Sequence, residues 1–389
     1  MEYTTLGEVC TIKSSKRIYQ SDYLEKGIPF YRGKEISQLS RGEKLDVELY
    51  ISENKYSELK DKFGKVQKGD LLITSVGTIG NTWVSDGRDF YYKDGNITQI
   101  VKNDNINTKF LHYLFKSNII KRQYSKGTSG TAQVALTIEK LKKIKIPKVP
   151  LEYQIKTVKL LEKSQELIDK RKEQIGDLDL LVKSKFTEMF GDVFLNTKNF
   201  EMKQIKDIVT VVKGITYKPN QVNEEGTIVL RSSNIKGSKF DLNDIVRVNK
   251  KIDEKFLVEV NDILMCNRNG SERLVGKVAK IPEYNEPMTF GTFMTIIRSP
   301  YYNYLFTFFQ TEAFRRQIKM QTSVAINQIS IPLLESVKVP LPPIELQNQF
   351  ADFVKQVDKL KFEMEKSLKE LEDNFNSLMQ KAFKGELFN

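Results

Sequence analysis

Two long stretches of the chain place apolar residues alternately three and four positions apart, the pattern of a helix that packs along one seam. One seam runs through residues 155–189 and the other through residues 350–382. A proline-containing segment precedes each stretch and Gly191 or Gly385 follows it, which suits the first turn and the C-terminus of a helix. The pattern therefore predicts two long amphipathic helices.

A seam that repeats about every 3.5 residues needs a helical partner, and the nearest equivalent helix is the other one in this chain. We predict that the two helices pair antiparallel within the chain. The alternative is that each helix packs only on its own domain. At about 1.5 Å per residue, a helix of roughly 36 residues extends about 54 Å, which exceeds one turn of DNA at about 34–36 Å.

Short apolar runs broken by Gly, Asn and Asp precede each long helix and predict β-strands. The clearest runs are Asp70–Thr74 and Asp262–Cys266, and aromatic-rich helical segments near Phe110–Arg122 and Tyr301–Lys319 follow them. A mixed α/β domain is therefore predicted before each long helix.

The two halves of the chain repeat the same features in the same order. Four pairs of segments match: Leu6–Val9 with Ile205–Ile208, Lys68–Ile73 with Val260–Met265, Ile146–Gln154 with Val339–Gln347, and Phe190–Phe194 with Lys384–Phe388. The second and third pairs are separated by 192 and 193 residues, about half of the 389-residue chain. Four matches in one order indicate a tandem duplication.

These patterns together predict an α+β fold. Two mixed α/β domains are joined by two long helices that form an antiparallel coiled coil, as a pseudo-twofold tandem repeat. The predicted boundaries are residues 1–150 for the first domain, 151–191 for the central helix, 192–342 for the second domain and 343–389 for the C-terminal helix.

The charge of the chain indicates a polyanionic partner. The net charge is +12. Segment Glu152–Phe190 holds 8 basic and 8 acidic residues, and Glu345–Phe388 holds 7 basic and 9 acidic residues. The basic excess therefore belongs to the two domains, which is expected if the domains contact phosphates and the helices act as a spacer.

Several chemistries are disfavoured by the residue inventory. The two cysteines, Cys10 and Cys266, are far apart and predict buried small side chains rather than a zinc site or a disulfide. The single histidine, His112, lies in an apolar helical segment and predicts a half-buried residue, so histidine-based catalysis has one candidate. No run spans a bilayer and no signal peptide begins the chain, which predicts a soluble cytoplasmic protein.

Polar loops in both domains carry residue types that contact DNA. Cations, hydroxyls and small residues approach phosphates closely, while arginine and amide side chains pair with guanine and adenine edges. For any single loop, a solvated surface turn is the alternative. The candidate DNA-binding residues are Lys13, Ser14, Ser15, Lys16, Arg17, Lys126, Thr128, Ser129, Thr131 and Gln133 in the first domain, and Lys213, Tyr217, Lys218, Arg231, Ser233, Asn234, Asn267, Arg268, Asn269, Arg273, Gln321, Thr322, Ser323, Asn327 and Gln328 in the second.

Over essentially its whole length, the sequence resembles a specificity (S) subunit of a type I restriction-modification system. The resemblance rests on the domain-helix-domain-helix order and on three short motifs. The motifs are the Pro-Leu/Ile-Glu-X-Gln helix starts at Val149–Gln154 and Val339–Gln347, the Gly-Asp-Leu-Leu strand at Gly69–Leu72 with its partner Asn261–Leu264, and Phe-Lys-Gly-Glu-Leu at Phe383–Leu387.

The resemblance implies two target recognition domains, each of which reads one part of a split, asymmetric site in double-stranded DNA. It also implies that the helices set the spacing between the parts and dock two modification (methyltransferase) subunits, with restriction (translocase-nuclease) subunits completing the complex. S-adenosylmethionine, ATP and Mg²⁺ would then be bound by partner subunits, with no cofactor and no metal in this chain. The sequence lacks an Asn/Asp-Pro-Pro-Tyr/Phe motif, a glycine-rich S-adenosylmethionine loop and a Walker A sequence.

Two other functions fit parts of the pattern. One is a standalone tandem-domain DNA-binding regulator or architectural protein. The other is an enzyme with acidic residues at its active site, such as Asp70 with Asp94, or Asp262 with Glu283. Against the enzyme, an aspartate just before a strand is usually an acceptor that closes a turn.

Overall fold

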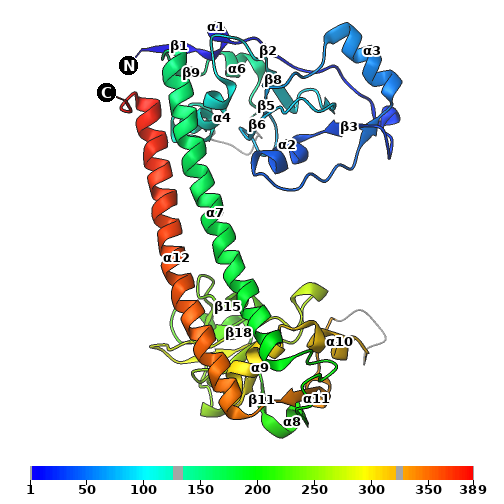
Figure 1. Cartoon of the computed structure of the whole chain (residues 1–389), viewed down its shortest axis with the longest axis vertical. Helices are drawn as coiled ribbons and strands as arrows, with labels where there is room; N and C mark the ends of the chain where they lie inside the picture. The colour runs from blue at the N-terminus through cyan, green and yellow to red at the C-terminus, as the bar shows by residue number, and fades with distance from the viewer. Residues whose placement is uncertain (1, 126–134, 321–326, 389) are drawn as a thin grey trace. The chain divides into compact units, whose positions relative to one another are not determined.

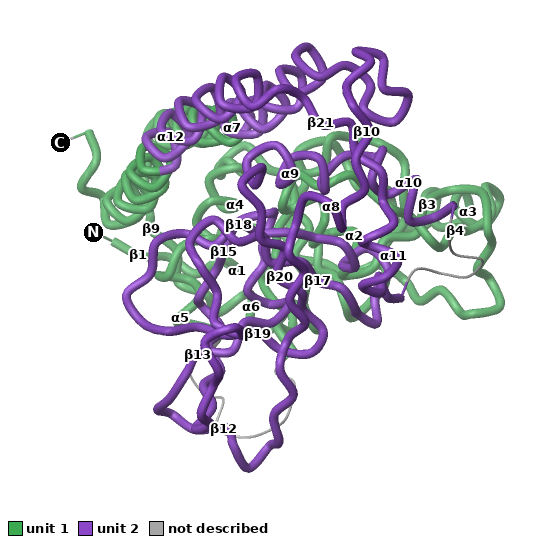
Figure 2. The backbone as a smooth tube through the Cα atoms, turned by 90° about the horizontal axis from the view of Figure 1, so that it is seen from below, with its two compact units in different colours: residues 1–172, 366–389 green, residues 173–365 purple. Residues whose placement is uncertain are grey.

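A computed structural model of the chain describes residues 2–125, 135–320 and 327–388. The chain divides into two compact units (Figure 2), one formed by residues 1–172 and 366–389 and the other by residues 173–365. Each unit combines one of the predicted domains with a half of each long helix, because the helix halves pack on the domain beside them. Of the described helices, none is both long enough and apolar enough to cross a membrane.

Unit 1 is built on a four-stranded antiparallel sheet of order β2-β8-β5-β6, with a three-stranded sheet of order β4-β3-β7 beside it. Its strands are β1 (Tyr3–Thr5), β2 (Ile12–Lys13), β3 (Ile28–Tyr31), β4 (Tyr50–Ile51), β5 (Leu71–Thr74), β6 (Thr82–Val84), β7 (Tyr91–Tyr92), β8 (Ile97–Ile100) and β9 (Lys145–Pro147). Its shorter helices are α1 (Leu6–Val9), α2 (Gly33–Ser40), α3 (Glu53–Phe63), α4 (Thr108–Lys116), α5 (Asn118–Ser125) and α6 (Ile138–Lys142).

Unit 2 repeats this plan with a sheet of order β11-β20-β17-β18 and a second sheet of order β12-β16-β13-β19. Its strands are β10 (Glu201–Gln204), β11 (Thr210–Lys213), β12 (Val222–Asn223), β13 (Thr227–Leu230), β14 (Ile235–Lys236), β15 (Lys239–Phe240), β16 (Arg247–Val248), β17 (Ile263–Cys266), β18 (Val278–Lys280), β19 (Met288–Phe290), β20 (Met294–Arg298) and β21 (Lys338–Leu341). Its shorter helices are α8 (Ile205–Ile208), α9 (Tyr302–Phe308), α10 (Glu312–Met320) and α11 (Ile331–Ser336).

The duplication found in the sequence is also present in the structure, because the two units share a similar arrangement of sheets. The second sheet of each unit contains one parallel pair, β3 with β7 and β13 with β19. In each unit a strand near the start of the domain pairs antiparallel with the strand that leads into a long helix, β1 with β9 and β10 with β21. The predicted α+β class, with mixed domains and two long helices, is confirmed.

Strands β5 and β17 each follow a turn, Gly69-Asp70 in unit 1 and Asn261-Asp262 in unit 2. The first residue of each pair has a left-handed backbone conformation. Gly69 has φ of 94° and Asn261 has φ of 71°, and asparagine is the side chain that tolerates this region best after glycine. The following aspartate closes the turn, since Asp70 accepts a bond from Gln67 N at 2.8 Å and Asp262 accepts one from Glu259 N at 2.7 Å. The prediction of a turn acceptor is confirmed in both copies.

The long helices are α7 (Leu151–Phe190) and α12 (Ile344–Lys384), each beginning after a proline, and each followed by a glycine in the left-handed region. The glutamine shared by their first turns has a structural role. Gln154 Nε2 donates to the Val149 carbonyl at 3.0 Å, and Gln347 Nε2 donates to the Pro342 carbonyl at 2.8 Å. Both side chains are buried, so the motif ties the start of each helix to the strand before it.

The two helices pack side by side in each unit (Figures 1 and 2), and their contacts show that they run antiparallel. In unit 1 the Tyr153 hydroxyl donates to the Ala382 carbonyl at 2.8 Å, and Lys172 forms an ion pair with Glu372 at 2.8 Å. In unit 2 the rings of Phe186 and Phe350 lie 5.5 Å apart within a buried aromatic cluster. Rising numbers on α7 thus meet falling numbers on α12, as predicted.

Two apolar residues that belong to the predicted seams by their spacing, Ile155 in the first helix and Leu360 in the second, are not buried as predicted. Ile155 is 38% exposed and Leu360 is 48% exposed, whereas the neighbouring Lys361 is 9% exposed and donates to Asp179. A lysine can bury its aliphatic stem against the seam while its ammonium group reaches a carboxylate at the edge. Periodicity cannot distinguish such a lysine from a surface residue.

His112 on α4 is half-buried as predicted, and its Nδ1 lies 2.9 Å from Thr82 Oγ1. Burial, and next the charge of Lys116, lower the pKa of His112 to about 3. The ordinary value in an unfolded chain is about 6.5. Between these values the unfolded chain binds a proton that the folded chain does not, so stability falls as the pH falls through this window.

We therefore expect unit 1 to lose up to about 1.4 kcal/mol of stability per pH unit below pH 6.5 through this group. Urea unfolding monitored by Trp83 fluorescence, at pH 7 and pH 5, measures this loss, because Trp83 is the single tryptophan and lies on β6 beside Thr82. His112→Gln should reduce the difference between the two pH values. An equal difference in the variant would contradict the assignment.

Candidate nucleic-acid interface

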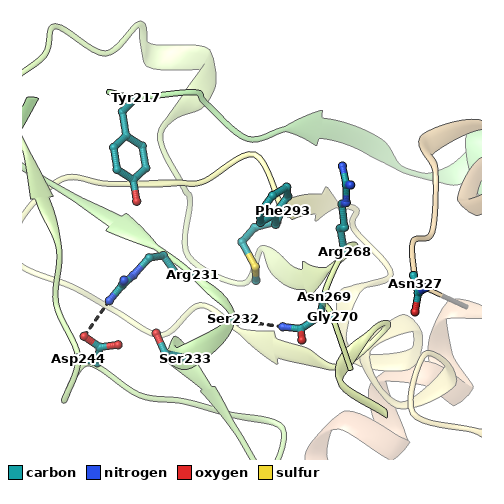
Figure 3. A pocket seen from close by; sticks show the side chains of 11 residues that line it. Tyr217, Arg231, Ser232, Ser233, Asp244, Arg268, Asn269, Gly270, Phe293 and Asn327 are labelled. Atoms are coloured by element: carbon teal, nitrogen blue, oxygen red, sulfur yellow. Dashed lines mark hydrogen bonds and ion pairs between the residues drawn. The ribbon is translucent and has the colours of Figure 1, made fainter. Parts of the chain in front are cut away.

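Unit 2 contains a cavity of about 760 Å³ in which predicted residues from several loops meet (Figure 3). Six of the candidate DNA-binding residues line it, namely Tyr217, Arg231, Ser233, Arg268, Asn269 and Asn327. The other lining residues are Ser232, Asp244, Gly270, Phe293 and Met294. The structure thus gathers residues that are up to 110 positions apart in sequence around one hollow, where two arginines and several hydroxyl and amide groups lie beside the apolar Phe293 and Met294.

The loop after β13 supplies Arg231 and is closed by Asn234. Asn234 Oδ1 accepts from Arg231 N at 2.8 Å, and its Nδ2 donates to the carbonyls of Asp241 at 2.8 Å and Asp244 at 2.9 Å. Asn234 is 1% exposed, so its amide holds the loop and is not presented to a ligand. Arg231 itself forms an ion pair with Asp244 at 2.7 Å across the cavity wall (Figure 3).

The loop after β17 supplies Arg268, whose guanidinium lies over the ring of Phe293, 5.3 Å from its centroid. The backbone holds this pair in place, since the Phe293 carbonyl accepts from Asn267 N at 3.0 Å and from Arg268 N at 3.3 Å. The backbone of Arg268 also forms an isolated antiparallel β-bridge with Gln328. Arg268 is exposed and Phe293 is 55% exposed.

The neighbouring asparagines support this loop. Asn267 is 8% exposed, and its backbone carbonyl accepts a hydrogen bond from Ile329 N at 2.7 Å. Asn269 Oδ1 accepts from Ser271 N at 3.0 Å, and its Nδ2 donates to Ser232 Oγ at 3.4 Å. These contacts position Arg268. Asn267 contributes through its backbone, and its buried side-chain Oδ1 has no hydrogen-bond partner among the described residues, whereas the amide of Asn269 is held within the loop.

The other candidates of unit 2 lie outside the cavity lining. Lys213 and Lys218 are exposed, Lys213 at the end of β11 and Lys218 just before a 3₁₀ turn (Pro219–Gln221). Arg273 is exposed and lines a second hollow of about 390 Å³ that also includes Phe314. Gln321, Thr322 and Ser323 lie outside the described residues.

In unit 1 the candidate loop Lys13–Arg17 is held against β7 and the turn that follows it. Ser15 Oγ donates to the Tyr92 carbonyl at 2.6 Å, and Arg17 forms an ion pair with Asp94 at 3.1 Å. Ser14 Oγ accepts from Gly95 N at 3.4 Å, the Lys16 backbone N donates to the Tyr91 hydroxyl at 2.9 Å, and Lys13 is partly exposed at the end of β2. Lys126, Thr128, Ser129, Thr131 and Gln133 lie outside the described residues.

The unit 1 counterpart of Arg231 is Arg32, which follows β3 as Arg231 follows β13. Arg32 is paired with buried Glu35 at 3.0 Å and with Glu48 at 2.7 Å. Lys34 and then Arg32 lower the pKa of Glu48 to about 2, so this carboxylate stays charged at neutral pH. At this position both units hold the arginine in ion pairs, Arg32 with two carboxylates and Arg231 with Asp244, so the units differ here in the number of charged partners.

The three aspartates named for an acidic active site are engaged in hydrogen bonds or ion pairs within their own domain. Asp70 is 1% exposed and accepts from Gln99 Nε2 at 2.6 Å and Lys102 N at 2.8 Å, and Asp94 is the partner of Arg17. Asp262 is 2% exposed and is held by Arg298 through two bonds of 2.8 Å. Among the described residues no group of three or more His, Cys, Asp or Glu side chains is arranged to hold a metal ion.

Comparison with known protein families shows which family this duplicated chain belongs to. The family described as type I restriction modification DNA specificity domain matches residues 1–177 and again residues 197–373. The chain belongs to this family. The two matched stretches coincide with the two structural copies, and the cavity of unit 2 lies within the second specificity domain.

Individual relatives agree. S.HindORF215P of Haemophilus influenzae is 34% identical over 193 residues, 49% of this chain and 47% of that protein. The type I restriction enzyme MjaVIII specificity subunit of Methanocaldococcus jannaschii is 23% identical over 361 residues, 86% of this chain and 83% of that protein. In the first two curated matches, the chain spans about half the length of the relative.

Solved structures share the fold of this specificity-domain protein. A chain from a structure of the type I R-M system, described by its complex assembly and conformational transition, has a TM-score of 0.63 at 18% identity, covering 99% of this chain and 98% of that one. The S subunit of a type I restriction-modification system from M. genitalium has a TM-score of 0.50 at 16% identity, covering 98% and 96%.

Proposed function

We propose that the chain is the non-catalytic DNA-recognition subunit of a type I restriction-modification complex, with each specificity domain reading one part of a split, asymmetric site. The observation that carries this proposal is the cavity of unit 2, where Arg231, Arg268 and several hydroxyl and amide groups converge from separate loops. Arginine is the side chain most often used to read guanine, and small polar residues suit close contact with DNA. The basic excess of the domains supports a DNA partner.

The long helices are proposed to set the distance between the two DNA contacts and to dock two modification subunits, with restriction subunits joining the complex. The 40-residue α7 and the 41-residue α12 are each continuous from one compact unit into the other, which suits a spacer. S-adenosylmethionine, ATP and Mg²⁺ would be used by those partners. The complex would act in the cytoplasm on cellular DNA.

A standalone DNA-binding regulator is less well supported, because the family match covers both halves of the chain and the matched proteins carry the name of specificity subunits. The two proposals differ in what they require of partners. A regulator would bind its site tightly alone, whereas a specificity subunit directs methylation by modification subunits.

Mapping of methylated bases in the genome of the source organism tests the function, in strains with and without the gene for this chain. We expect one split sequence motif to lose methylation when the chain is absent and to regain it on complementation. An unchanged methylation map, combined with altered transcription, would favour the regulator instead.

A further inference from the structure

We propose that unit 2 reads a guanine and a thymine in adjacent base pairs, through Arg268 and Phe293 acting as a pair. This inference rests on the proposed function and names the bases that its second specificity domain recognises. It concerns one wall of the cavity, where a cation and an exposed aromatic ring lie together (Figure 3).

The two arginines of the cavity differ in their availability. Arg231 is engaged by Asp244 at 2.7 Å. Among the described carboxylates none forms an ion pair with Arg268, and its guanidinium lies over the Phe293 ring. Because none of the described carboxylates occupies its N–H groups, the Arg268 guanidinium can donate two parallel bonds to O6 and N7 of a guanine.

Phe293 is the unusual residue of this wall. A phenylalanine that is 55% exposed on a short turn between β19 and β20 contributes little to the core. Its backbone is nevertheless fixed, because its carbonyl accepts two bonds from the Arg268 loop. An exposed ring at a fixed position on the cavity wall is suited to apolar contact with the C5-methyl group of thymine. This methyl group is the one apolar group on a base edge in the major groove of DNA.

The spacing of the pair fits neighbouring bases. The guanidinium carbon lies 5.3 Å from the ring centroid, while successive bases of one strand are about 3.4 Å apart along the axis. Two groups this close can contact two adjacent bases but cannot span several base pairs. The pair therefore reads one dinucleotide step.

Unit 1 offers an internal comparison. The strand registers pair Thr74 with Ile97 and Cys266 with Met294, which places Val76 and Asn96 where unit 2 has Arg268 and Phe293. Neither side chain of this unit 1 pair carries a cation or an aromatic ring. The same guanine and thymine preference is therefore expected in one half-site only, the half read by unit 2.

The test uses the full chain assembled with its modification subunits and short duplexes that carry the selected site. Competition binding compares wild type with Arg268→Ala, Arg268→Lys and Phe293→Ala. We expect Arg268→Ala to reduce the preference for guanine at one position by roughly 10- to 100-fold, with partial retention in Arg268→Lys, and no change in the half-site read by unit 1. Lys218→Ala is the comparator, an exposed cation of unit 2 outside the cavity, and should change binding to all sequences equally.

Replacement of the neighbouring thymine by deoxyuracil removes only the methyl group. Wild type should bind the thymine duplex several-fold more tightly than the deoxyuracil duplex, and Phe293→Ala should abolish this difference. Thermal unfolding of each variant, compared with wild type, shows that the fold is retained.

Equal losses on every sequence in Arg268→Ala would assign Arg268 to a phosphate and overturn the proposal. So would a Phe293→Ala variant that still discriminates thymine from deoxyuracil, or one that loses affinity for every base by the same factor, as a stacking wedge would. If the wild-type complex has a split site whose bases are unaffected by either variant, only this inference fails. If the wild-type complex has no sequence preference, the proposed function fails.

Discussion

Insertion of three heptads into each long helix, after Lys172 in α7 and after Glu365 in α12, is expected to lengthen the preferred DNA spacer by about nine base pairs. These positions lie at the boundary between the compact units on both helices. Twenty-one residues add about 31 Å of helix, which is close to one turn of DNA at about 34–36 Å. Nine base pairs make about nine-tenths of a turn, so both half-sites again lie near the same face of the duplex and binding to the longer site should remain tight.

Insertion of a single heptad in both helices is the matched control. It adds about 10 Å, or about three base pairs, and these turn one half-site roughly a third of the way around the duplex. Binding should then weaken on every spacer, by about 10³-fold or more on the original site, because specific contacts to one half are lost. Competition binding across a series of spacers measures both variants. An unchanged optimum in the three-heptad variant would show that the helices do not set the spacing.

Substitution Asp262→Ala is expected to destabilise unit 2 by about 2–4 kcal/mol. Asp262 is buried, closes the turn before β17 and holds Arg298 by two bonds of 2.8 Å. The value begins below the roughly 3–5 kcal/mol for breaking a buried ion pair, because Arg298 is 30% exposed and retains Glu259. Since β17 is a central strand and leads into the Arg268 loop, reading of one half-site should also be lost.

The equivalent change in unit 1, Asp70→Ala, is the control. It removes bonds from Gln67, Gln99 and the backbone of Lys102 but leaves no buried cation behind, so a loss of about 1–3 kcal/mol is expected. Urea unfolding is followed by circular dichroism for the whole chain and by Trp83 fluorescence for unit 1. In Asp262→Ala, circular dichroism should show an early transition that Trp83 does not report. Equal shifts of both signals in both variants would contradict the assignment.

Local patterns in the sequence predicted the frame of this protein. The seams, the prolines and glycines at the helix ends, and the aspartates before β5 and β17 depend on neighbouring residues, so the same rules hold in sequence and structure. The duplication added a further constraint, because each element had to occur twice. The long-range order of the strands, with one parallel pair in the second sheet of each unit, has no local signal and came from the structure alone.

The candidate site could be predicted only in part. Arginine and asparagine loops were recognisable by composition, but composition cannot distinguish an amide that faces a ligand from one that closes its own loop, as Asn234 does. Phe293 was not predicted, because an aromatic residue beside a strand reads as core. An informative signal was its place in a turn after Gly291, where a core residue is not expected. The burial of Lys361 was not predicted either, because a charged residue is expected at the surface although its aliphatic stem can be buried.

Selection from a random DNA library tests the central claim most directly. The complex of this chain with its modification subunits is incubated with random duplexes, and the bound sequences are determined. Two domains of different chemistry on one duplicated frame predict two unlike blocks of fixed bases separated by a spacer of constant length and free sequence. One continuous block, a palindrome of two identical halves, or the absence of any enriched sequence would contradict the account.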